Sequence, residues 1–287
     1  MHQLCDTLRV EAHHLEPHRD LMPITTLSGL VAVALYLISL TLQGQAIKAR
    51  SARTKTQGKV LITGLAAVLA HGISAWSLIA RTDGYHFGVT EISTLIFAVI
   101  ALFAIISSAR RPLGNLIIGV FPFAALVIVL SLIIDSNYPA QPIDAGIASH
   151  ILLSIVAYSL FTLAAVQAAF LAFQNYQLRH KHAASVIKRF PPLQDMERLL
   201  FELIWVAQGL LSLGIIAGFV FVEDLGAQGL PHKMFFSVLA WIVFAVLLWG
   251  RHQLGWRGNT AIRGTLAGFI CLLLGFYGSK FVLEFIL

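Results

Sequence analysis

The stretch Pro112–Ile134 reads PLGNLIIGVFPFAALVIVLSLII and contains no charged residue. A helix that crosses the hydrocarbon core of a bilayer needs roughly 20 apolar residues, which this stretch supplies. Seven more apolar stretches of similar length follow one another along the chain, separated by short polar connectors. The sequence therefore predicts an all-α integral membrane protein, a bundle of eight transmembrane helices. The expected spans are Ile24–Leu42, Val60–Ile79, Glu91–Ala109, Pro112–Ile134, His150–Phe173, Leu199–Phe221, Lys233–Trp249 and Ile262–Phe285.

The composition agrees with this class of protein. Hydrophobic residues make up 57% of the 287 residues, charged residues only 12%, and the mean hydropathy is +0.80. A chain of this length cannot bury so much apolar surface in a water-soluble core. The lipid bilayer is therefore the first expected partner, and the expected location is the inner membrane of a bacterial cell, crossed many times.

The basic residues set the expected orientation. Most of the 20 Lys and Arg residues lie in alternate connectors, and an excess of such residues is typical of cytoplasmic connectors. We therefore expect both chain termini on the outer, periplasmic side. This topology accounts for the net charge of +6, which indicates no nucleic-acid partner. The residues of the inner connectors are Lys48, Arg50, Arg53, Lys55, Lys59, Arg110, Arg111, Arg179, Lys181, Lys188, Arg189, Arg198, Arg251, Arg257 and Arg263.

The N-terminal segment is polar. Residues 1–21 lack the apolar region of a signal peptide, so we expect a polar overhang followed by one transmembrane domain over residues 22–287. Met22 stands directly before the first span and is an alternative start of the chain. Histidines give the overhang a second interpretation, a metal-binding tail. They are His2, His13, His14 and His18.

Further histidines fall toward one side of the predicted bundle. Imidazole is costly in lipid and ligates haem iron and transition metals, so such a grouping predicts a cofactor site. The cofactor-binding candidates are His71, His86, His150 and His232.

His150 opens the fifth predicted span. The polar residues that follow it at steps of four, on one helical face, are Ser154, Tyr158 and Thr162. This polar stripe runs inward from the outer surface, which makes His150 a candidate axial ligand with Ser154 and Tyr158 in support. Polar stripes also hydrogen-bond neighbouring helices, and a histidine at a span boundary can rest among lipid headgroups. Both interpretations of the stripe stay open.

His232 lies at the outer start of the seventh span, at the same depth as His150. Two histidines at matched depth can supply both axial positions of one haem iron. The ammonium of Lys233 can pair with an anionic group such as a haem propionate at the interface. The alternatives are a loop histidine and a lysine that snorkels to the headgroups. Trp241, on the same span, is a further supporting candidate.

His71 lies near the middle of the second span, where an imidazole without a partner is costly. The small residues on its face, Gly64, Ala67 and Ser74, would admit another helix or a porphyrin plane. A hydrogen-bonded histidine between packed helices is the alternative. His86 lies in the outer connector after that span and is either a further ligand or an exposed loop residue.

Several motifs are missing from the sequence. The two cysteines are Cys5 and Cys271, and no C-x-x-C-H motif for covalent haem attachment occurs. Any haem is therefore expected to be b-type and held non-covalently. No hydrolase triad motif and no phosphate-binding glycine loop occur either, so we do not expect an enzyme.

Two stretches resemble a known family. Residues 150–158, HILLSIVAY, resemble the H-x-x-x-S/M-x-x-x-Y helix start of the cytochrome c assembly, or haem-handling, transmembrane family. Residues 231–241, PHKMFFSVLAW, resemble its D-P-K-E…W helix, and Gly255–Gly258 resembles its inner G-W-x-G turn. The segment Arg189–Glu197 and the ending Gly278–Phe281 are similar to the YpjD/HemX-like branch.

This resemblance implies a haem-binding inner-membrane protein that acts beside other membrane proteins of cytochrome c maturation or of the haem pathway. His150 matches the family's first outer histidine, and His232 falls at the proline of its pattern. The haem-presenting members carry a tryptophan-rich loop before the seventh span, whereas residues 222–230, VEDLGAQGL, contain no tryptophan. A platform that stacks haem for ligation to cysteine is therefore not expected.

We predict a haem-binding or haem-handling membrane protein whose haem iron is held by His150 and His232. Two other classes stay open. One is a transport accessory, in which His71 and the polar stripe form a path across the membrane. The other is a regulatory or assembly scaffold, whose segment Gln174–Arg198 docks a cytoplasmic partner. Co-purified haem favours the first class, and a bound partner without pigment favours the scaffold.

Overall fold

The computed structural model describes residues 2–48, 53–81, 83–110, 114–134, 139–140, 143–179, 192–221 and 231–278. In the first, second and last of these ranges the described side chains are those of residues 24–47, 56–81 and 234–278. Within this part of the chain, eight helices are long and apolar enough to cross a membrane, which confirms the predicted fold class. They belong to α1 (His2–Lys48), α2 (Arg53–Ile79), α3 (Val89–Arg110), α4 (Asn115–Ile133), α5 (Ala145–Arg179), α6 (Leu193–Phe221), α7 (Pro231–Gln253) and α8 (Asn259–Leu273). The eighth span includes the residues that continue α8 as far as Gly278.

The helices extend beyond several predicted spans. The fifth helix begins at Ala145 rather than His150, and the sixth begins at Leu193 rather than Leu199. Hydropathy detects only the apolar part of a helix, whereas its backbone hydrogen bonds continue into polar residues. Asp195 lies in the first turn of α6, where the helix dipole favours an acid. A π-helical segment, η2 (Leu274–Gly278), continues α8.

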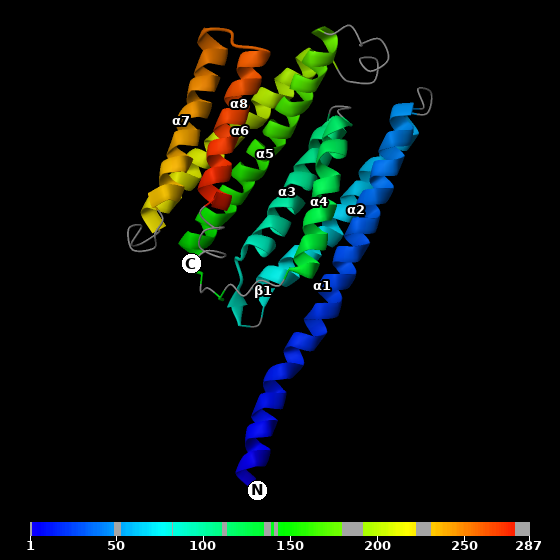
Figure 1. Ribbon diagram of the computed structural model, residues 1–287, viewed down its shortest axis with the longest axis vertical. Helices are drawn as coiled ribbons and strands as arrows, with labels where there is room; N and C mark the ends of the chain where they lie inside the picture. Colours follow the sequence, from blue (N-terminus) through cyan, green and yellow to red (C-terminus); the bar gives the residue numbers. More distant parts are fainter. Residues whose placement is uncertain are drawn as a thin grey trace.

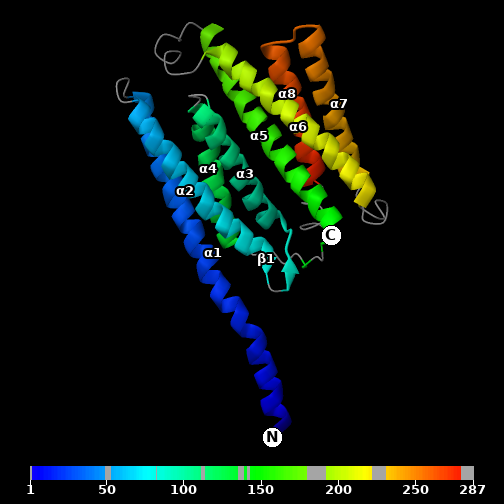
Figure 2. The same ribbon diagram turned by 180° about the vertical axis from the view of Figure 1, so that it is seen from behind.

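The eight helices form two rings of four. In the first ring, α1 and α3 each pack against α2 and α4. In the second ring, α5 and α7 each pack against α6 and α8. Figures 1 and 2 show the rings side by side, with α3 and α4 of the first ring next to α5 of the second. The chain runs through both rings in the same order and direction, because α1 and α5 start from the same end of the bundle.

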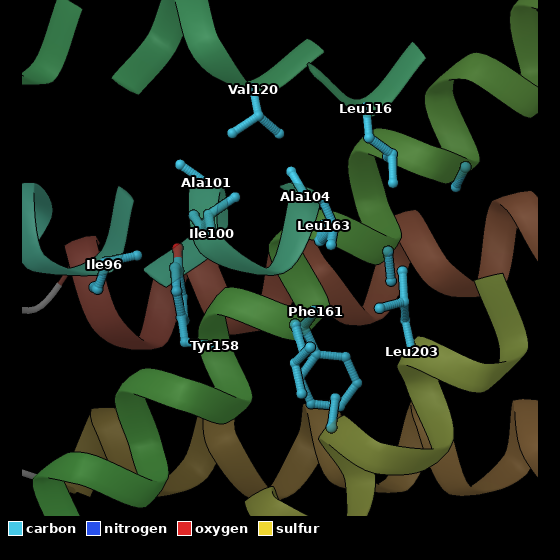
Figure 3. Close-up of a cluster of buried hydrophobic side chains, with 14 of the residues drawn as sticks. Ile96, Ile100, Ala101, Ala104, Leu116, Val120, Tyr158, Phe161, Leu163 and Leu203 are labelled. Carbon is cyan, nitrogen blue, oxygen red and sulfur yellow. The ribbon is translucent and has the colours of Figure 1, made fainter. Parts of the chain in front are cut away.

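The core lies where the rings meet, and Figure 3 shows its side chains. The ring of Phe161 on α5 stacks on that of Phe244 on α7, with 4.0 Å between the ring centroids. Lipid tails are as apolar as these side chains, so close van der Waals fit, helped by small residues, holds the helices together. Buried residues of this seam are Ile96, Ile100, Ala101, Ala104, Leu116, Val120, Leu163 and Leu203.

The two ends of the bundle differ in chemistry. The histidine end carries the starts of α3, α5 and α7, together with a hairpin of β1 (Ala80–Arg81) and β2 (Gly84–Tyr85). The basic end is formed by the opposite helix ends. Its described basic residues are Lys59, Arg110, Arg179, Arg198, Arg251, Arg257 and Arg263. This clustering agrees with the predicted topology, while the assignment of the basic end to the cytoplasm, with both termini outside, stays a prediction.

Candidate functional site

His150 lies in the second turn of α5 and points toward α6. Its Nδ1–H donates a hydrogen bond of 2.8 Å to the backbone carbonyl of Gly214. Because a carbonyl oxygen only accepts, Nδ1 carries a proton, and in the neutral imidazole the lone pair is therefore on Nε2. The half-buried ring also lies against Gly218, where an added Cβ would come within 3.0 Å of Cε1. Gly214 and Gly218, one turn apart on α6, therefore leave the space that this imidazole occupies.

The polar stripe that follows His150 turns around α5. Ser154 faces α6, and its Oγ lies 3.5 Å from the position that a Cβ of Gly214 would take. Tyr158 is buried instead among aromatic side chains of α8 and η2, and its hydroxyl has no partner among the described residues. Thr162 bonds only to the carbonyl of Tyr158 on its own helix. Four residues advance about 400° around a helix, so each step turns the stripe by about 40° away from α6.

His232 and Lys233 belong to the first turn of α7, and their backbone lies at the histidine end. Their side chains lie outside the described residues. Trp241, farther along α7, donates from its indole Nε1–H to the hydroxyl of Ser212 on α6 at 2.8 Å. Its backbone carbonyl accepts a bond of 3.1 Å from the side-chain amide of Gln208. Trp241 thus ties α7 to α6.

His71 belongs to the first ring, away from the α5–α6 site. It is fully buried, and its Nδ1 lies 3.1 Å from the hydroxyl of Tyr36 on α1. Tyr36 packs in turn against Phe121 on α4, with 4.7 Å between the ring centroids. This hydrogen bond agrees with the interpretation of His71 as a hydrogen-bonded histidine between packed helices. Its Nε2 is buried, and no described residue supplies a partner for it.

His86 is buried against the hairpin and is not an exposed loop residue. Its Nε2–H donates to both carboxylate oxygens of Asp83, at 3.1 Å each, and its backbone N–H donates to Ile79. The hydrogen bond from His86 holds the pKa of the Asp83 carboxyl below its ordinary value. Beside it, the buried Glu91 pairs with Arg81 at 3.4 Å.

His71, His86 and His150 therefore occupy three separate places. No group of three or more His, Cys, Asp or Glu side chains in the described ranges is arranged to hold a metal ion. A haem needs only one or two axial side chains, so each histidine is judged singly. His150 fits best, because its proton is fixed on Nδ1 by a backbone carbonyl and Nε2 is available as a base. The Nε2 of His86 is already engaged by Asp83.

Two features of the site were not predicted. Gly214 and Gly218 follow each other at a spacing of four, a pattern of small residues that signals a close helix contact, yet their role depends on which helix docks there. Tyr36 as partner of His71 has no local signal, because the two residues lie on different helices.

The chain is similar to one known family and to several known proteins. The family described as Cytochrome C assembly protein matches residues 60–287. The inner membrane protein YpjD of Escherichia coli (strain K12) is 28% identical over 268 residues, which cover 92% of this chain and 100% of that protein. Protein HemX of Brevibacillus brevis is 22% identical over 163 residues, 53% of this chain and 58% of that protein.

Cytochrome c biogenesis protein CcsA of Gloeobacter violaceus is 25% identical over 104 residues, which cover 36% of this chain and 31% of that protein. No solved structure matches the chain significantly.

Proposed function

The chain belongs to the cytochrome c assembly protein family, as the resemblance in its fifth and seventh spans predicted, and we propose that it handles haem for cytochrome c maturation or haem supply. The name of the similar CcsA, a cytochrome c biogenesis protein, supports this role. The single observation that carries the proposal is the hydrogen bond from His150 to Gly214, which leaves Nε2 of the imidazole as a base.

We assign the protein to the inner membrane, which it crosses many times. The eight candidate spans support this assignment, and so does the name of the similar inner membrane protein YpjD. The clustering of basic residues at one end supports placing the histidine end outside the cytoplasm.

In this proposal, Nε2 of His150 would hold the iron of a b-type haem without a covalent link to the porphyrin. His232, in the first turn of α7 at the same end of the bundle, would be the second histidine to hold it. The neighbouring Lys233 would pair with a haem propionate. His86 is ranked below them because Asp83 engages its Nε2, and His71 because it is fully buried in the first ring, away from the α5–α6 site.

The bound haem would supply iron and porphyrin, and the chain would supply their surroundings. The carbonyl of Gly214 orients the imidazole of His150 through Nδ1. Ser154 places a hydroxyl beside the same contact, whereas Tyr158 turns toward the aromatic side chains of α8 and η2. We propose no bond-making residue in this chain, so that attachment of haem to cysteine would fall to a partner in the membrane.

The proposal is tested by the absorption spectrum of the full-length protein purified in mild detergent from cells supplied with haem. We expect a Soret band and sharp bands after reduction, both strongly weakened in His150→Ala. His252→Ala is the matched control, because this exposed histidine lies at the end of α7, at the basic end. A colourless wild type would overturn the proposal, and so would equal spectra for all three proteins.

A further inference from the structure

A cavity of about 270 Å³ opens at the basic end, between the last turns of α5 and the start of α8. Its polar lining comes from one face of each helix, because the lining residues of each helix follow at steps of three and four. These residues are Asn175, Tyr176 and Arg179 on α5, and Asn259 and Arg263 on α8. This cavity is separate from the histidine end and has no part in the proposed haem site.

The lining is rich in hydrogen-bond donors and positive charge. Arg179 and Arg263 are exposed, and no acidic side chain among the described residues pairs with either. The side-chain amide of Asn175 donates to Oδ1 of Asn259 at 2.8 Å, which joins the two helices across the cavity. The amide nitrogen of Asn259 is then left to donate into the cavity. Two guanidinium groups and an amide suit an anion with several oxygens, as a phosphate has.

The position of the cavity indicates where such an anion comes from. Ala172 lines it two turns deeper along α5 than Arg179, and Ile262 adjoins Arg263 on α8, so the cavity has an apolar side as well. Basic pockets between transmembrane helices at the cytoplasmic surface bind the head groups of anionic lipids. A volume of about 270 Å³ exceeds many times the roughly 10–15 Å³ that one water occupies by such a measure, so a polyatomic head group has room.

We propose that this cavity binds the phosphate of an anionic phospholipid. The two arginines hold the phosphate oxygens, Asn259 adds a hydrogen bond, and the acyl chains run into the membrane along α5 beside Ala172. The lipid thereby clamps the end of α5 to the start of α8, the contact that closes the second ring.

The test is lipid binding to the full-length protein in detergent, followed by native mass spectrometry and by the thermal unfolding midpoint. The probes are dioleoyl phosphatidylglycerol, dioleoyl phosphatidylcholine and inorganic phosphate. The variant is Arg179→Gln with Arg263→Gln. The matched control, Arg110→Gln with Arg257→Gln, removes the same charge from exposed arginines of the basic end that do not line the cavity.

We expect phosphatidylglycerol to bind at least fivefold more tightly than phosphatidylcholine, and the cavity variant to lose at least fivefold in affinity for it. The control should lose less than twofold. An equal loss of phosphatidylglycerol affinity in both double variants would show that binding depends on general charge attraction, and would overturn the proposed site. Inorganic phosphate that alone reproduces the full stabilisation would overturn the lipid as its ligand. Should the double variant not fold, the single Arg263→Gln decides by the same criteria.

Discussion

Arg251 at the end of α7 and Glu197 near the start of α6 form an ion pair of 2.6 Å. The second carboxylate oxygen of Glu197 accepts the backbone N–H of Gly258 at 3.3 Å, and Arg251 also donates to the carbonyl of Trp256 at 3.1 Å. One carboxylate thus joins α6 to the turn between α7 and α8.

Glu197→Gln should lower the free energy of unfolding by about 1–3 kcal/mol, because the partly buried guanidinium of Arg251 loses a charged partner. Glu202→Gln is the control, since its pair with Arg198 is exposed and should contribute less than about 0.5 kcal/mol. Thermal unfolding in detergent measures both. Equal shifts for the two variants would contradict the role of Glu197 in holding this turn.

Tyr36→Phe should destabilise the first ring. The substitution removes the hydroxyl 3.1 Å from Nδ1 of His71 and leaves a second buried nitrogen of that ring without a partner, at a cost of about 1–3 kcal/mol. Tyr85→Phe removes the same hydroxyl from an exposed tyrosine of the hairpin and should have little effect. The comparison is made by chemical or thermal unfolding, and no difference between the two variants would show that the Tyr36–His71 bond contributes nothing.

Gly218→Ala should disturb the imidazole of His150. The new methyl carbon would stand 3.0 Å from Cε1 and 3.2 Å from Nδ1, so the ring must shift and its bond to Gly214 must lengthen. We expect a changed ¹⁵N resonance for Nδ1 and, if the proposed haem binds, a weaker Soret band. Gly209→Ala, the same change on the same helix with nothing within 4 Å, should alter neither and should stabilise α6 by about 0.5–1 kcal/mol. Identical spectra for both variants would argue against a close contact between Gly218 and the imidazole of His150.

The hairpin should respond to acid through Asp83. The hydrogen bond from His86 lowers the pKa of this carboxyl in the folded protein, so the interaction stabilises the fold above the ordinary aspartate pKa. The stabilisation is lost as the pH falls through the lowered pKa. Because Asp83 is half exposed, the effect should stay at about 0.5 kcal/mol or less.

Thermal midpoints of the wild type and of Asp83→Asn, followed from neutral to strongly acidic pH, should therefore converge at low pH. With His86→Gln already present, Asp83→Asn should produce no such pH-dependent difference. A difference that persists in the His86→Gln background would assign the effect to another partner of Asp83.

The spans were predictable because each one depends only on a local run of apolar residues, such as 112–134. The hairpin had a weaker local signal, the glycine at position 84, which pairs with Arg81 and adopts a φ of 136° that suits glycine. Its strands are only two residues long, too short to show an alternating pattern.

The candidate site was predictable only in part. The position of His150 near the start of a span followed from the sequence. Its hydrogen bond to Gly214 did not, because that contact joins residues on two helices. The stripe below it was expected to share one face. Each step of four residues turns the stripe by about 40°, so Tyr158 points toward α8 and η2 instead. This angle is small, but it is enough to move a side chain of α5 from the contact with α6 to the contact with α8.

The arrangement in two rings of four bears on the origin of the chain. Four crossings return a polypeptide to the side of the membrane from which it started, so a four-helix ring is a complete topological unit. A tandem copy of such a unit inserts in the same orientation as the original, whereas a copy with an odd number of crossings would be inverted. Duplication of one ancestral four-span gene, joined at the connector between α4 and α5, is therefore sufficient to produce the order and direction of helices seen here.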